Sequence, residues 1–167
     1  DLRNLRNLAI TAGINDVRLS RDTKCIHPSL KRILKDLEEN AYDRRIPKMV
    51  NDYFFDMQIV FQGIYKRMKT GGRVAIDLGD SVYAGIYIPT HEILTNILEE
   101  IGFKLIDEVV LRRRVSKGGE ELQQVLLIYE KESSTRKNNS QNYEWDNKWQ
   151  YFKNNLPHQK LPFSKRN

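Results

Sequence analysis

A long apolar stripe at residues 46–68 limits the possible folds of this chain more than any other feature. Apolar residues recur there mostly at steps of three and one, which is the spacing of one face of an α-helix. The stripe is rich in aromatic residues and lasts about six turns. Pro47 suits its first turn, and Gly71-Gly72 suits its end. The stripe consists of Ile46, Met49, Val50, Tyr53, Phe54, Met57, Val60, Phe61, Ile64, Tyr65 and Met68. A helix with one wholly apolar face needs a broad cover, so we expect it to pack on a β-sheet.

The residues after this helix predict alternating strands and helices. Residues 73–78 form an apolar run typical of a buried strand, and residues 82–88 predict a loop. Residues 90–101 predict a helix, with Thr90 as its N-cap, Glu92 in its first turn and Gly102 at its end. Two further strands are expected at 104–115 and 122–129. The glycine-containing turn 116–120 joins them as a hairpin.

This order favours an α/β fold. A strand, a crossover helix and a second strand typically form a parallel pair, and a tight hairpin then makes the last strand antiparallel. The sequence therefore predicts a mostly parallel sheet with a C-terminal antiparallel hairpin. The alternative is another α/β fold that ends in a hairpin, and the order of elements favours the two equally.

The regions on either side of this half domain, 46–131, differ from it in character. The region 1–45 predicts the end of one helix, then a loop, then a helix that begins at Pro28 and ends near Asn40. The region 132–167 is a basic and aromatic linker or tail that contains both tryptophans. Its rings can stack on nucleic-acid bases or pack against a protein surface.

The composition favours a nucleic-acid partner in a reducing compartment. The net charge is +6, and the stretch from Lys131 to Asn167 holds eight Lys or Arg against three Asp or Glu. The single thiol, Cys25, forms no internal disulfide, which is typical of a cytoplasmic protein. No apolar run is long enough to span a membrane, so we expect no membrane partner. The first residue is not Met, and we expect the sequence to begin inside a longer protein.

Several motifs between Tyr53 and Lys131 resemble those of site-specific DNA methyltransferases that modify exocyclic amines. The segment "MKTGG" resembles the family's "LKPGG" element, and "RVAIDLGDS" resembles its fifth strand. The segment "YIPTHEIL" is similar to the helix that follows, and "LRRRVSKGGEELQQVLLIYEK" to the terminal hairpin. The tail "NLPHQKLPFSKRN" is similar to the segment that links this half to the cofactor-binding half in circularly permuted members. The chain is thus identified as a fragment or subunit of an N4-cytosine or N6-adenine methyltransferase that carries the later motifs.

The resemblance implies a partial Rossmann-like sheet for S-adenosylmethionine methyltransfer, of which this chain supplies the last three of seven strands. The family's catalytic signature is Asp, Ser or Asn followed by Pro-Pro-Tyr or Pro-Pro-Phe, and its cofactor signature is a glycine-rich turn. This sequence has neither a Pro-Pro pair nor a G-x-G. We therefore assign no catalytic residue. We expect S-adenosylmethionine to be bound by the missing half or a second polypeptide, and the chain alone to be inactive.

The resemblance places candidate base-pocket residues after the first strand of this region. Asp80, Ser81 and Tyr83 follow the carboxyl end of that strand, where ligand clefts form in open α/β sheets. The alternative for Asp80 is a loop carboxylate that caps nearby amides, and for Tyr83 a place in the core. Asp77 is expected in the middle of a buried strand, where an unpaired carboxylate is costly. It is either functional or bonded to a group in the missing half.

The densest basic cluster outside the tail is a candidate DNA-binding surface. Arg112 and Arg114 share one face of a strand, and Lys117 lies in the hairpin turn. These cations can contact DNA phosphates, which give affinity without sequence choice. The alternative is a solvated edge with cross-strand pairs to Glu120 and Glu121.

Two function classes follow from these observations. The first is part of an S-adenosylmethionine-dependent DNA methyltransferase, in a restriction-modification or related system, that acts on adenine or cytosine. The second is a non-catalytic nucleic-acid-binding or scaffold protein on a degenerate methyltransferase fold. An RNA-modifying relative is a third option.

Overall fold

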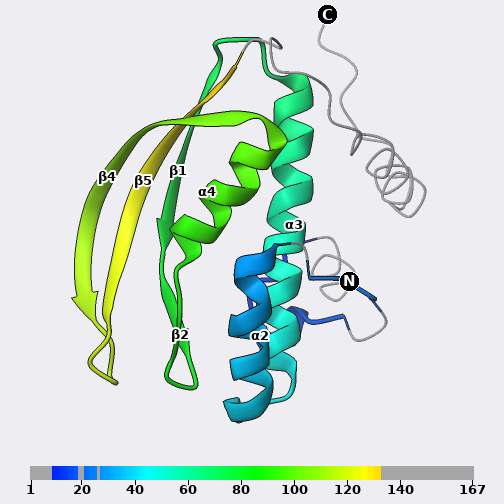
Figure 1. Cartoon of the computed structure of the whole chain (residues 1–167), viewed down its shortest axis with the longest axis vertical. Coiled ribbons are helices and arrows are strands. Elements are labelled where there is room, and N and C mark those ends of the chain that lie inside the picture. The colour runs from blue at the N-terminus through cyan, green and yellow to red at the C-terminus, as the bar shows by residue number, and fades with distance from the viewer. Residues whose placement is uncertain (1–8, 19–20, 26, 133–167) are drawn as a thin grey trace, which may run out of the picture. The chain divides into compact units, whose positions relative to one another are not determined.

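The computed structural model describes residues 9–18, 21–25 and 27–132, all within one compact unit, Asp1–Ser133. The helix end expected before residue 9 and the tail expected after residue 132 lie outside the described residues. The main sheet has three strands, and Figure 1 shows that it is curved, with helices on one side of it. In the described part of the segment 11–27, which was predicted as a loop, the one helical element is a short 3-10 helix, η1 (Ile14–Asp16).

The helices predicted from Pro28 to near Asn40 and over residues 46–68 are confirmed. Helix α2 (Pro28–Asn40) starts at the predicted proline, and His27 caps it by accepting a hydrogen bond from the Ser29 N–H. Helix α3 (Arg45–Arg67) contains most of the predicted stripe. Its buried apolar side chains are Ile46, Pro47, Met49, Val50, Phe54, Met57 and Phe61.

The C-terminal end of α3 is stabilised by a residue far away in the sequence. Lys66 and Arg67 place positive charge in its last turn, which the helix dipole favours. In addition, the Lys131 ammonium donates to the carbonyls of Tyr65 and Met68 at 2.7 and 2.9 Å. These carbonyls have no partner within the helix, so the last strand of the sheet satisfies them.

The sheet corrects the predicted topology. Its strands β1 (Arg73–Gly79), β4 (Phe103–Val115) and β5 (Glu121–Lys131) lie in the order β1-β5-β4, and both pairings are antiparallel. The prediction of a mostly parallel sheet is therefore wrong for the described strands, whereas the antiparallel hairpin is confirmed. Strands β1 and β4 do run in the same direction, because both are antiparallel to β5. The connection through α4 places β4 one strand away from β1. The hairpin that follows β4 then places β5 between the two.

Residues 81–88 form a hairpin and not the predicted loop. Strands β2 (Ser81–Tyr83) and β3 (Ile86–Ile88) pair antiparallel. Ala84 and Gly85 form the turn with φ values of 54° and 76°. Two successive positive φ angles are what a two-residue hairpin of this hand requires. The sequence does not predict this turn, because alanine rarely adopts a positive φ.

Helix α4 (Thr90–Ile101) connects the sheet to the other helices. Gly102 ends it at φ 110°, and Glu92 lies in its first turn, both as predicted. The predicted N-cap is wrong, because Thr90 is already helical and Pro89 precedes it without a side-chain hydrogen bond. In Figure 1, α4 lies between the sheet and α3.

The two faces of the sheet differ in cover. On β5 the inner side chains Val125, Leu127 and Tyr129 are fully buried in the core that α3 and α4 share. On β1 the outer positions Ala75, Asp77 and Gly79 are exposed. Strand β1 was predicted to be buried, but within the described residues it is buried on its helix side only.

Candidate functional site

The candidate site is organised by Asp80, which follows the last residue of β1. Its side chain is buried, with 1% of the residue exposed. The Asp80 carboxylate accepts hydrogen bonds from the Tyr87 hydroxyl (2.6 Å), His91 Nδ1 (2.8 Å), the Thr90 N–H (3.0 Å) and the Gln123 N–H (3.3 Å). One carboxylate therefore ties the end of β1 to the β2–β3 hairpin, to α4 and to β5.

This network explains how α4 begins without a cap of its own. Thr90 is the first residue of α4, and its N–H would otherwise lack a partner. A negative charge at the helix N-terminus is also favoured by the helix dipole. Burial, and next the hydrogen bond to Asp80, raise the pKa of the Tyr87 hydroxyl, so that it stays protonated and donates. Asp80 thus accepts from neighbouring amides, as the capping interpretation expects.

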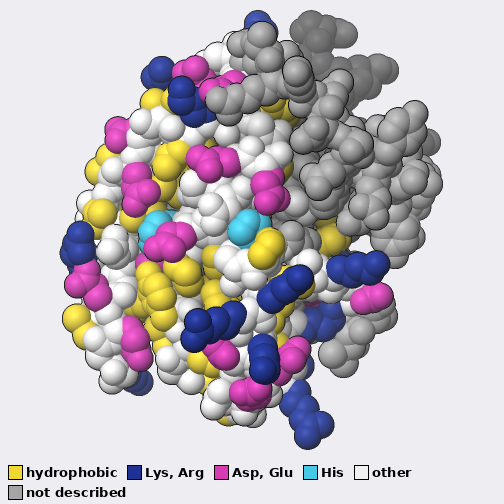
Figure 2. All heavy atoms as spheres, viewed as in Figure 1, with side chains coloured by type: hydrophobic (Ala, Val, Ile, Leu, Met, Phe, Trp, Pro, Cys, Tyr) yellow, Lys and Arg dark blue, Asp and Glu magenta, His cyan; other side chains and the backbone are white. Residues whose placement is uncertain are grey.

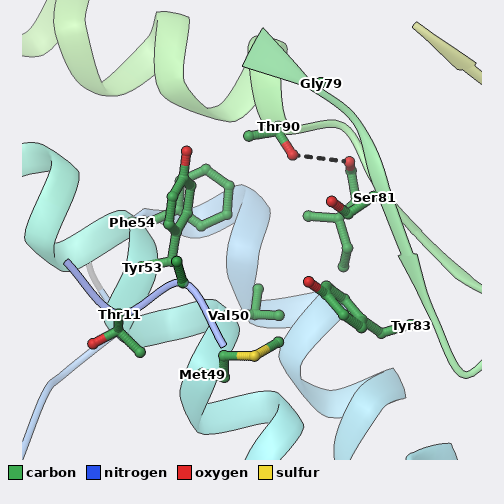
Figure 3. Close-up of a pocket in the computed structure, with 11 residues that line it drawn as sticks. Thr11, Met49, Val50, Tyr53, Phe54, Gly79, Ser81, Tyr83 and Thr90 are labelled. Atoms are coloured by element: carbon green, nitrogen blue, oxygen red, sulfur yellow. Dashed lines mark hydrogen bonds between the residues drawn. The ribbon is translucent and has the colours of Figure 1, made fainter. Parts of the chain in front are cut away.

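A cavity of about 170 Å³ lies beside this network, between α3, the β2–β3 hairpin and the segment that contains Thr11. Figure 3 shows Met49, Val50, Tyr53 and Phe54 of α3 on one side, with Ser81 and Tyr83 of β2 on another. An engineered apolar cavity of about 150 Å³ holds one benzene ring. The space therefore suits one aromatic ring system. Two candidate residues from the sequence, Ser81 and Tyr83, line it, whereas Asp80 lies behind its wall.

The lining combines aromatic rings with hydroxyl groups. Of the lining residues, Phe54 and Thr90 are buried, whereas Ala12 and Gly79 are exposed, so the cavity reaches the surface. Burial, and next the neighbouring Tyr83, raise the pKa of the Tyr53 hydroxyl. A neutral phenol can stack on a ring and still donate a hydrogen bond. The Thr90 hydroxyl donates weakly, at 3.4 Å, to a backbone carbonyl of β3.

The N-terminal segment closes one side of the cavity and is held by a buried carboxylate. Thr11 lines the cavity, and both its N–H and its hydroxyl donate to Asp56 Oδ2 at 2.9 Å. The other oxygen of Asp56 pairs with Arg21 at 2.6 Å, and the Arg21 guanidinium lies over the Phe55 ring. A second carboxylate of α3, Asp52, pairs with Lys48 at 3.1 Å. The Asp56 contacts hold the backbone that carries Thr11.

Sequence reasoning did not find these contributions from α3. Tyr53 and Phe54 have the spacing of core residues, and nothing local separates a cavity wall from a packed core. A usable signal was present in Asp52 and Asp56. Two acidic residues four apart in a strongly apolar helix lie on one face and need partners there.

A second hollow lies on the outer face of the sheet, on the other side of the end of β1. It is lined by Asp77, Gly79, Arg112, Arg114 and Gln124. The Gln124 amide donates to both oxygens of Asp77 at 2.9 and 3.0 Å. Asp77 is therefore exposed and bonded within the chain, and the expectation of a buried strand position is wrong for the described residues.

The arginine cluster divides between the two faces as its spacing predicts. Arg112 and Arg114 both line the hollow. Arg113 points to the other face and pairs with Glu121 at 2.5 Å. Arg114 donates to the Asp80 carbonyl at 3.3 Å, whereas the Arg112 guanidinium has no hydrogen bond or ion pair to any described residue.

The hairpin turn is ordered around Ser116. The Gly118 and Glu120 N–H groups donate to the Ser116 hydroxyl oxygen, and that hydroxyl also contacts the Glu120 carboxylate. This last hydrogen bond lowers the pKa of Glu120. Lys117 is exposed in the turn, with no partner among the described residues. Glu120 is thus engaged locally, and of the two predicted cross-strand acids only Glu121 pairs with an arginine.

Charge elsewhere on the surface is mixed. Figure 2 shows basic and acidic side chains interspersed over α2. Pairs four residues apart, Arg32 with Asp36 and Lys35 with Glu39, account for part of this pattern at 3.9 Å each. Such exposed pairs contribute little to stability. The surface of α2 therefore presents no excess of one sign, unlike the hollow beside Arg112.

Two kinds of site are absent from the described part of the chain. It holds no group of three or more His, Cys, Asp or Glu side chains arranged to bind a metal ion. Among its helices, none has the length and apolar character needed to cross a membrane.

The chain is similar to known DNA-modifying enzymes. It is 31% identical over 80 residues to the Type II methyltransferase M.BsoBI of Geobacillus stearothermophilus, which covers 48% of this chain and 16% of that protein. It is 30% identical over 96 residues to the Type II methyltransferase M.AvaI of Nostoc sp. strain PCC 7120, which covers 57% of this chain and 20% of that protein. M.AvaI of Anabaena variabilis matches equally well. No model of a protein family matches the chain.

The resemblance drawn from the sequence motifs is thereby confirmed: the chain has homologues among the Type II DNA methyltransferases. The matched part spans about a fifth of the length of these relatives. A crystal structure of an inferred DNA modification methylase from Thermus thermophilus is similar at a TM-score of 0.40 and 16% identity, over 86% of this chain and 56% of that one.

Proposed function

We propose that this chain is part of an S-adenosylmethionine-dependent DNA methyltransferase that modifies the exocyclic amine of adenine or cytosine. The chain contributes a wall of the pocket for the target base and a DNA-contacting hairpin. The observation that carries the proposal is the ring-sized cavity beside the end of β1, in a chain whose relatives are Type II methyltransferases. Enzymes that modify a base within a duplex must flip it into such a pocket.

The residues of the cavity match what a flipped base needs. The Tyr53 and Tyr83 rings offer stacking surfaces, and the hydroxyls of Ser81 and Thr90 can bond to base edges. Asp80 positions this wall by holding Thr90 and the β2–β3 hairpin. Arg112, Arg114 and Lys117 lie on exposed surface and supply positive charge for DNA phosphates.

The described residues do not fit S-adenosylmethionine. The segment after β1 is not a glycine-rich turn, and its carboxylate is already occupied by four donors. A cavity of about 170 Å³ is also too small for an adenosine joined to an amino acid. We therefore place the cofactor and the catalytic tetrapeptide on another part of the enzyme or on a second polypeptide. On this view residues 46–131 form the methyltransferase half domain of a cytoplasmic enzyme.

A second candidate function is a nucleic-acid-binding scaffold without catalytic activity. The observation in its favour is that the sequence lacks both a Pro-Pro pair and a G-x-G. Such a protein would retain the hollow beside Arg112 and bind DNA without modifying it.

Methyl transfer to DNA separates these functions. The purified chain is incubated with labelled S-adenosylmethionine and plasmid DNA, alone and together with the polypeptides encoded beside it. We expect label in DNA only from the combined proteins. In the combination, Tyr83→Ala should lower the rate at least tenfold. The control Tyr42→Ala should leave it unchanged, because Tyr42 is 79% exposed and does not line the cavity.

Two results would contradict the proposal. Methylation by the isolated chain would show that the cofactor site is within it. DNA binding by every combination without any methyl transfer would favour the scaffold.

A further inference from the structure

The ring-sized cavity and the arginine hollow meet at one residue. Gly79 lines both, and it is the last residue of β1. The cavity extends from Gly79 toward Ser81 and Thr90, on the helix side of the sheet. The hollow extends from Gly79 toward Arg112 and Arg114, on the outer face. The two spaces are therefore neighbours across the end of a single strand.

The hollow has the chemistry of an anion site. Arg112 and Arg114 carry two positive charges, and Asp77 carries one negative charge that Gln124 already binds. A local excess of one positive charge remains. The Arg112 guanidinium donates to none of the described residues, so its N–H groups can bind a ligand. Arg114 uses one nitrogen on the Asp80 carbonyl. Paired guanidinium groups are suited to the oxygens of a phosphate.

The backbone does not require glycine at position 79. Its φ lies outside the left-handed region, and a Cβ placed there would meet nothing closer than the Gln123 carbonyl at 4.0 Å. A side chain is therefore sterically permitted, and a β-branched residue would suit a strand position. Gly79 is exposed and lies on the outer face with Ala75 and Asp77, so its missing side chain leaves open space at the margin of the hollow.

We propose that the cavity and the hollow form one binding site for a single nucleotide, whose sugar crosses the end of β1 at Gly79. The base occupies the cavity, and the adjacent phosphate occupies the hollow between Arg112 and Arg114. The inference rests on the proposed function for the identity of the ring, and it adds a phosphate subsite and the residue that joins the two spaces. Asp80 couples them, since its carboxylate holds Thr90 while its carbonyl accepts from Arg114.

Substitution of Gly79 by valine tests the junction. NMR titrations of the ¹⁵N-labelled chain at low salt would measure binding of the deoxynucleoside 5′- and 3′-monophosphates of adenine and cytosine, the deoxynucleosides, and inorganic phosphate. For the wild-type chain we expect at least one monophosphate to bind ten times more tightly than its deoxynucleoside. Gly79→Val should abolish that advantage.

Ala75→Val is the matched control. Ala75 lies on the same strand and the same exposed face, four residues before Gly79, and lines neither space. It should bind the monophosphate as the wild type does. Urea denaturation of both variants checks that the fold is retained.

The proposal is overturned if Gly79→Val binds the monophosphates with wild-type affinity. It is equally overturned if no monophosphate binds more tightly than its deoxynucleoside. These titrations need neither cofactor nor DNA, so they can succeed when the methyl-transfer experiment fails, and the reverse. The two ideas are thereby tested separately.

Discussion

The polar cluster around Asp80 and the polar cluster around Arg112 flank the same strand end but have opposite environments. The Asp80 carboxylate is buried and accepts from four donors, whereas the Arg112 guanidinium is exposed and has no partner among the described residues. Burial of a charge is tolerated only when its hydrogen bonds are satisfied. An exposed charge with free donors is satisfied by water and can exchange that water for a ligand.

This difference predicts a structural role for the Asp80 cluster and a binding role for the Arg112 cluster. Asp80 joins four elements and holds the cavity wall, so its removal should affect folding. Arg112 holds no element in place, so its removal should affect binding alone. Variants in and around each cluster can refute or refine this contrast.

The largest effect is expected for Asp80→Ala. The substitution leaves the Thr90 and Gln123 N–H groups and the His91 ring without their acceptor in a buried place, and we expect a loss of about 3–5 kcal/mol in the free energy of unfolding. The matched control is Asp77→Ala, which removes an exposed carboxylate from the same strand and should cost about 0.5 kcal/mol or less. Urea denaturation measures both. Equal losses for the two variants would remove the distinction between the clusters.

A smaller effect is expected at alkaline pH from Tyr129. Burial, offset in part by a hydrogen bond to Thr95, raises the pKa of the Tyr129 hydroxyl to about 12. Its ordinary value is about 10, so the folded chain retains this proton where the unfolded chain loses it. The contribution to stability is complete below pH 10 and is lost as the pH rises through about 12.

Thermal unfolding at pH 8 to 11.5 measures this loss. The Tyr129→Phe variant should lose less stability above pH 10 than the wild type does. Tyr42→Phe should follow the wild-type curve, since Tyr42 is exposed. Parallel curves for the wild type and Tyr129→Phe would contradict the assignment.

The smallest effect on stability is expected for Arg112→Ala combined with Lys117→Ala. Both side chains are exposed and unpaired among the described residues, so the change in the free energy of unfolding should stay within about 0.5 kcal/mol. Binding of DNA by the complete enzyme should instead show a shallower dependence on salt, by about one unit of slope for each phosphate that the variant no longer neutralises. Arg113→Ala is the control, because Arg113 pairs with Glu121 on the other face. An unchanged salt slope in the double variant would show that this surface does not bind DNA.

Much of the candidate site could be placed from the sequence, but its three-dimensional partners could not. Ser81 and Tyr83, chosen because they follow the end of a predicted strand, line the cavity. Arg112 and Arg114 share a face because alternation along a strand is a local property. Asp80 was recognised as important, yet its partners Tyr87, His91 and Gln123 come from three other elements. Tyr53 and Phe54 carry no local mark that distinguishes a cavity wall from the core.

Local sequence was enough to locate where most elements begin and end. The stripe at 46–68, the glycines at 71–72 and 102, and the turn at 116–120 are read from neighbours in the chain, and all four correspond to features of the structure. The hairpin at 81–88 escaped detection because its turn uses alanine at a positive φ. Local preferences act over a few residues, so they determine where helices, strands and turns lie better than how these elements pack together.

The order of the strands, in contrast, was settled by tertiary contacts alone. Whether β1 pairs with β4 or with β5 depends on contacts between residues about 30 to 60 positions apart, and the hydrophobic pattern satisfies either pairing. The return of β5 between β1 and β4 brings Gln123 to Asp80 and Gln124 to Asp77. That single insertion sets the cavity and the arginine hollow on opposite sides of Gly79.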